Sequence, residues 1–160
     1  RAANYPDPHA DRGHHEVTLA IRPHGAGLAD VRAAAARLNS PLRVVKGTGN
    51  GTAAAATPVV VVSGPDGGAA PGVEVDAVKL ADDGSGDLIV RLHEACGNRI
   101  RISVATPQRI TAAWRCDLLE EPETGEEVGD GIVAITLRPF QIVTLRLRRS
   151  TTADGRSLVD

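Results

Sequence analysis

The chain is poor in aromatic residues and cysteine, and it has no long hydrophobic run. Of its 160 residues, 2% are aromatic and two are cysteines, Cys96 and Cys116. Two cysteines are too few for a disulfide scaffold, and no apolar run approaches the roughly 20 residues that cross a bilayer. A formal net charge of −2 gives no field that would attract nucleic acid or an anionic membrane. We therefore expect a soluble, cytoplasmic protein with reduced thiols, no nucleic-acid partner and no membrane partner.

Hydrophobic residues make up 42% of the chain, which is enough for a packed core. Because aromatics are scarce, that core must be built from Val, Leu, Ile and Ala. Residues 88–93 and 99–104 alternate apolar with other side chains, the pattern of strands with one buried face. The short connector Cys96-Gly-Asn98 favours a tight turn. We predict that these two strands form an antiparallel hairpin.

Five further runs have strand patterns, and turn signals separate them. The parity of the apolar residues switches near Asp76, which predicts a β-bulge there. Seven short strands of this kind indicate a mainly β protein, an antiparallel β-sandwich. The five runs are residues 58–62, 73–80, 110–118, 132–137 and 141–148.

The N-terminal third has two patterns of its own. Residues 15–22 alternate as a strand does, whereas Leu28, Val31, Ala35 and Leu38 have the spacing of one helical face. One short amphipathic helix is therefore expected in this third of the chain. A glycine-rich stretch at residues 46–52 then predicts a linker. We divide the chain into residues 1–57, a sandwich at 58–150, and a polar, frayed tail at 151–160.

Short motifs follow one another from about Pro6 to Leu147. They read Pro6-Asp-Pro8, Ala10-Asp-x-Gly-x-His15, Pro23-His24, Leu38-Asn-x-Pro-Leu42, Arg91-Leu-x-Glu-Ala-x-Gly97, Asp117-Leu-Leu-Glu120 and Leu137-Arg-Pro-Phe-x-Ile-x-Thr-Leu145. In this order they resemble the C-terminal end of the family 38 glycoside hydrolases, the zinc-dependent retaining α-mannosidases. The chain departs from the family pattern at Val17, Leu19 and His93, where aromatic residues are common.

The resemblance implies a non-catalytic C-terminal β portion of an enzyme that hydrolyses α-mannosidic bonds. Residues 1–57 would end the large central β-domain, and residues 58–150 would be a small C-terminal sandwich. The catalytic carboxylates and zinc ligands of such an enzyme lie in an N-terminal α/β domain, so no catalytic or metal-binding residue is assigned here. Zinc and mannosides would belong to the intact enzyme, whose catalytic and central domains are the expected partners. The alternative is a free-standing sandwich that binds carbohydrate or protein, which the scarcity of aromatics disfavours.

Three residues near the N-terminus are candidates for a position close to substrate: Arg1, Asp11 and His15. They lie on a polar, proline-containing segment, and loops often carry functional residues. The resemblance places this segment directly after central-domain strands that pack beside the catalytic domain. Gly13 would shape a turn with Asp11, and an ordinary connecting loop is an equal alternative. An independent metal site is disfavoured because His14 and His15, as neighbours on a strand, would point to opposite faces.

Three further features have structural interpretations. Glu94 shares the parity of Leu92, so its carboxylate should face inward and needs a partner, an arginine or backbone amides. Trp114 could stack on a sugar, but a single aromatic is more typical of packing. The glutamates of residues 120–127 are expected to form a solvated acidic loop.

Overall fold

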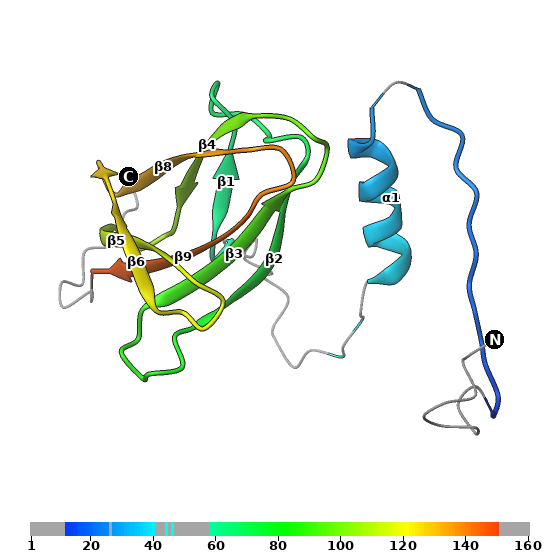
Figure 1. Ribbon diagram of the computed structural model, residues 1–160, viewed down its shortest axis with the longest axis horizontal. Coiled ribbons are helices and arrows are strands. Elements are labelled where there is room, and N and C mark those ends of the chain that lie inside the picture. Colours follow the sequence, from blue (N-terminus) through cyan, green and yellow to red (C-terminus); the bar gives the residue numbers. More distant parts are fainter. Residues whose placement is uncertain (1–11, 26, 41–43, 45, 47–57, 151–160) are drawn as a thin grey trace.

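A computed structural model describes residues 12–25, 27–40, 44, 46 and 58–150 of the chain. Within these residues, the protein is a sandwich of two antiparallel β-sheets with one helix beside it (Figure 1). The strands are β1 (Val61–Ser63), β2 (Val73–Leu80), β3 (Leu88–Glu94), β4 (Ile100–Ala105), β5 (Ile110–Cys116), β6 (Pro122–Glu126), β7 (Val128–Gly129), β8 (Ile132–Leu137) and β9 (Ile142–Arg149).

Both sheets mix strands from distant parts of the sequence. The four-stranded sheet has the order β1-β4-β8-β7, and the five-stranded sheet has the order β2-β3-β9-β5-β6. Strands β3 and β9 lie at the centre of the five-stranded sheet, where Val90 pairs with Leu145. The predicted fold class, a mainly β antiparallel sandwich with one short helix, is confirmed.

The core lies between the two sheets and is entirely aliphatic, as the composition predicted. Strands β3, β4, β8 and β9 contribute alternate residues to it, which is the inward face of a pleated strand. Burying one such Val, Leu or Ile side chain contributes about 1.5–3 kcal/mol. The core residues are Leu88, Val90, Leu92, Ile102, Val104, Ile110, Ala113, Val133, Ile135, Leu137, Val143, Leu145 and Leu147.

The predicted hairpin is wrong, although both of its strands exist. Strand β3 pairs with β2 and β9, whereas β4 pairs with β1 and β8, so the two strands belong to different sheets. The connector at residues 95–99 therefore crosses from one sheet to the other. Its Gly97 has a φ of 80°, as a tight change of direction requires. Alternation identified the strands and their buried faces, but it carries no information about which strand pairs with which.

Two other details of the sheets bear on the sequence predictions. The register of β2 against β3 shifts between Val75 and Ala77, which confirms the bulge predicted near Asp76. The acidic stretch expected as a loop instead contains strand β6, which pairs with β5. Its outward side chains are exposed, but Glu126 forms an ion pair with Arg115 at 2.7 Å.

The predicted helix is present as α1 (Ala29–Asn39). The predicted strand at residues 15–22 is wrong, because residues 12–25 contain no strand. Val17, Leu19 and Ile21 are 75%, 88% and 98% exposed. No described strand pairs with this segment, and an alternating pattern forms a strand only where another strand supplies backbone partners. No helix in the described part of the chain is long and apolar enough to cross a membrane.

The predicted division of the chain has no test in the structure. Residues 41–43, 45 and 47–57, which hold most of the expected linker, lie outside the described residues. The tail at residues 151–160 lies outside them as well. The boundary at residue 57 therefore stays a prediction.

Candidate functional site

The Glu94 carboxylate ties two turns of the sandwich together. At the end of β3 it is 1% exposed, and its oxygens accept backbone N–H bonds from Cys96 at 2.9 Å, Gly97 at 2.8 Å and Phe140 at 3.0 Å. Burial alone would raise the pKa of Glu94, but these N–H groups and that of Asn98 outweigh it and lower the pKa below its ordinary value. The prediction that Glu94 faces inward and is satisfied by backbone amides is confirmed.

The packing around these turns leaves no room for larger side chains. A Cβ atom on Gly72 would lie 2.9 Å from Cys96 Sγ, and one on Gly97 would lie 3.0 Å from Phe140 Cζ. The backbone closes the arrangement, because Ala95 N donates to Gly72 O at 2.7 Å. The β3–β4 crossing and the β8–β9 turn are therefore held in one fixed arrangement around Glu94.

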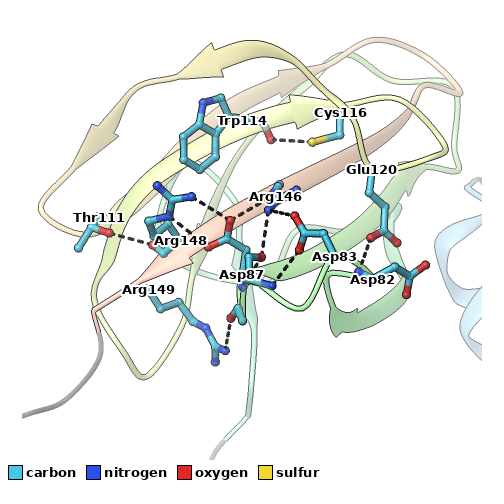
Figure 2. A network of polar contacts seen from close by, with 12 residues as sticks. Asp82, Asp83, Asp87, Thr111, Trp114, Cys116, Glu120, Arg146, Arg148 and Arg149 are labelled. Carbon is cyan, nitrogen blue, oxygen red and sulfur yellow. Dashed lines mark hydrogen bonds and ion pairs between the residues drawn. The ribbon is translucent and has the colours of Figure 1, made fainter.

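A second buried carboxylate, Asp87, lies on the outer face of the five-stranded sheet, where the loop before β3 covers β9 (Figure 2). Asp87 is 4% exposed and accepts from Arg146 Nε at 2.8 Å and from Arg148 Nε at 3.2 Å. Arg146 also donates to Asp83 at 2.6 Å. Burial raises the pKa of Asp87, but the hydrogen bonds and charges of Arg148 and Arg146 have the larger opposite effect. The pKa of Asp87 is therefore below its ordinary value.

Further contacts extend this arginine and aspartate network along the sheet. The guanidinium of Arg148 lies 5.0 Å from the ring centre of Trp114, a cation–π contact (Figure 2). Trp114 is half-buried, and Arg148 lies over its ring. A stacked sugar would need the ring face that Arg148 covers. At the other end, Lys79 contacts both Asp82 and Glu120 at 2.6 Å.

A third cluster links helix α1 to the five-stranded sheet. Arg32 donates from Nε to one oxygen of Glu74 at 2.5 Å and from Nη2 to the other at 3.0 Å. Its Nη2 also lies 3.1 Å from His93 Nε2, while His93 Nδ1 lies 2.8 Å from Asp76. Because an arginine can only donate, this geometry suits a His93 whose Nε2 accepts and whose Nδ1 donates to Asp76. The side chain of one helical residue thus meets two neighbouring strands.

The structure does not test the N-terminal candidates. Arg1 and Asp11 lie outside the described residues, and His15 is exposed. Gly13 has a φ of 131° and open space around it. The assignment of Arg1, Asp11 and His15 to a place near substrate therefore stays a prediction. In the described ranges, no group of three or more His, Cys, Asp or Glu residues could hold a metal ion.

The chemistry that these clusters can perform is limited by their pairing. A general acid or base works best with a pKa near the operating pH, whereas Glu94 and Asp87 both have lowered pKa values and are fixed as anions. The Cys116 thiol has a pKa that burial raises, which makes it a poor nucleophile. Both cysteines are unpaired, Cys96 half-buried and Cys116 buried. The arrangement is suited to holding loops and a helix in place.

Sequence reasoning found Glu94 but missed the Asp87 network and the Arg32 contact. Arg146 and Arg148 alternate with core leucines in β9, which places two cations on one face and signals a need for anions there. Nothing in the local sequence names Asp87, 59 residues before Arg146, as that anion. The same is true of Arg32 and Glu74, which are 42 residues apart.

Comparison with known proteins gives two kinds of match. Residues 72–145, from the start of β2 into β9, match the family described as glycosyl hydrolases family 38 C-terminal beta sandwich domain. The chain is also 32% identical to alpha-mannosidase 2C1 of Homo sapiens and 33% identical to alpha-mannosidase 2C1 of Mus musculus, over 92% of its own length. It spans 14% of the length of each of these relatives.

Proposed function

Because residues 72–145 belong to the C-terminal β-sandwich domains of glycosyl hydrolase family 38, we propose that the chain is a non-catalytic β portion of an α-mannosidase. The match to that domain family is the observation that supports this most strongly. In the intact enzyme the rest of the polypeptide would hydrolyse α-mannosidic bonds by a zinc-dependent retaining mechanism. We place that enzyme in the cytoplasm.

The role of this chain would be to brace the catalytic part of the enzyme. Its buried carboxylates support this role. Glu94 accepts hydrogen bonds from backbone amides and Asp87 from arginines, so both act within the sandwich as structural groups. Its partners would be the catalytic and central domains of the same polypeptide, and mannosides would be substrates of the whole.

Deletion of residues 58–150 from the intact enzyme tests the proposal. We expect loss of soluble, active enzyme, because surfaces that the sandwich covers would become exposed. Full retention of aryl α-mannoside hydrolysis after the deletion would contradict bracing. It would favour a free-standing binding module, which the separately produced sandwich could then confirm by binding a glycan.

We further propose that Arg1, Asp11 and His15 lie at the rim of the active site in the intact enzyme. The support is the polar, proline-containing character of this segment together with its motif resemblance. Single replacement of Arg1 or Asp11 by alanine should lower kcat/KM and leave thermal stability unchanged. Unchanged turnover in both variants would show that the segment is an ordinary connecting loop.

A further inference from the structure

Phe140 is the single phenylalanine of the chain, and it occupies an unfavourable position. Its backbone φ is 57°, in the left-handed region, and its side chain is 68% exposed. A bulky residue in this region is strained, whereas Gly or Asn would be accommodated easily. Because most of its ring is exposed, burial within the sandwich contributes little free energy to offset this backbone strain. Burial in the core does not explain why a phenylalanine stands there.

The sandwich fixes the backbone at Phe140 and contacts one side of its ring. Phe140 N donates to the buried Glu94 carboxylate, and the next residue, Gln141, accepts from Glu94 N at 3.0 Å. Its ring lies directly against the Gly97 turn, so close that a Cβ atom on Gly97 would lie 3.0 Å from Phe140 Cζ. A rigid apolar side chain loses little conformational entropy on binding, and such pre-organisation is typical of interface anchors.

A second exposed apolar residue follows Phe140 in the chain. Ile142, two residues along the chain at the start of β9, is 60% exposed. It pairs across the sheet with His93, which contacts Arg32 of helix α1. The β8–β9 turn and helix α1 therefore lie at the same end of the five-stranded sheet (Figure 1). We call Phe140 and Ile142 the Phe140 anchor.

We propose that the Phe140 anchor inserts into an apolar pocket on the catalytic part of the same polypeptide. This inference rests on the proposed function and names the surface through which bracing occurs. The curated relatives are far longer than this chain, which spans 14% of each, so most of such an enzyme lies outside it and is available to cover the anchor. Aromatic residues that fill a pocket contribute much of the binding energy of typical interfaces. Occupation of such a pocket also accounts for a phenylalanine at this position, where the turn closed by Gln141 N and Arg138 O at 3.1 Å sets a positive φ that favours glycine or asparagine.

Photo-crosslinking in the intact enzyme tests the contact directly. A benzoylphenylalanine would replace Phe140 in one variant and Val59 in a control variant. Val59 is a 54% exposed apolar residue just before β1, which belongs to the other sheet. After irradiation, peptide mass spectrometry should find position 140 joined to the catalytic part of the chain, and position 59 not joined to it. Crosslinks from position 140 only to helix α1, only to a second enzyme copy, or to nothing would each overturn the proposal.

The variant Phe140→Asn separates the ring from the backbone conformation, because asparagine tolerates a positive φ. In the intact enzyme this variant should lose activity on heating about fivefold faster than the parent, the effect of losing one anchor. Val59→Ala should change that rate less than twofold. An unchanged rate for Phe140→Asn would overturn the proposal that the Phe140 anchor fills a pocket.

If the deletion of residues 58–150 still abolished activity, bracing would stand and would act through another surface. If that deletion were harmless, the proposed function itself would fall.

Discussion

The carboxylate of Glu94 accepts a hydrogen bond from the backbone N–H of Phe140, 46 residues further along the chain, at 3.0 Å. One buried anion thereby joins the crossing between the two sheets to the turn between β8 and β9. Interactions of this kind fix loops that have no core of their own.

Replacement of Glu94 by alanine should destabilise the fold by about 1–3 kcal/mol or more, because it leaves buried N–H groups without an acceptor. Urea denaturation of the chain measures the free energy of unfolding. Glu123→Ala is the matched control, since Glu123 is an exposed residue of β6 and its loss should change stability by less than about 0.5 kcal/mol. Equal stabilities for the two variants would show that Glu94 is not a structural tie.

Acid should weaken the fold through the same carboxylates. Both Glu94 and Asp87 have pKa values lowered from ordinary values of 4.5 and 3.8, so the folded state binds protons less readily than the unfolded chain. Their contribution to stability is therefore fully present above about pH 5 and is lost as the pH falls through the lowered pKa values. Urea midpoints from pH 7 to pH 3 should decline less steeply for Glu94→Gln than for the parent. Parallel declines would rule out a contribution from Glu94.

The Asp87 network should be more important for stability than an exposed ion pair. Asp87→Asn removes the anion that faces Arg146 and Arg148, and breaking a buried pair in this way costs about 3 kcal/mol. Arg22→Ala breaks the pair between Arg22 and Asp30, whose side chains are 49% and 63% exposed, and should change stability far less because solvent screens an exposed pair. Thermal unfolding of both variants makes the comparison. A loss for Asp87→Asn no larger than that for Arg22→Ala would contradict the network's structural role.

The sequence was informative about strands and faces, and much less so about partners. Parity placed Glu94 in the core and located the bulge near Asp76, because both follow from the two-residue period of a strand. The pairing of β3 with β9 depends on contacts between residues 49 to 59 positions apart, which local periodicity does not contain. For this reason the expected β3–β4 hairpin was wrong.

The same limit applies to the polar clusters and to the segment at residues 15–22. Two arginines on one face of β9 indicate that an anion is needed, but they do not identify Asp87. Residues 15–22 have the alternation of a strand, yet pairing also requires a neighbouring strand with free donors and acceptors. Among the described strands none pairs with this segment.

The contact between Arg32 and Glu74 should be what holds helix α1 against the sheet. No residue of α1 is buried, so apolar packing contributes little and the bidentate contact, with its neighbour His93, is the main interaction observed. In Arg32→Ala, backbone amides of α1 should exchange with deuterium faster, since an isolated helix of 11 residues is marginal in water.

Arg37→Ala is the matched control, because it removes an arginine from the exposed part of the same helix. Hydrogen exchange followed by mass spectrometry on α1 and β2 peptides separates the two. Faster exchange in both variants would mean that arginine supports helix formation generally, and unchanged exchange in Arg32→Ala would mean that the docked helix does not depend on this contact.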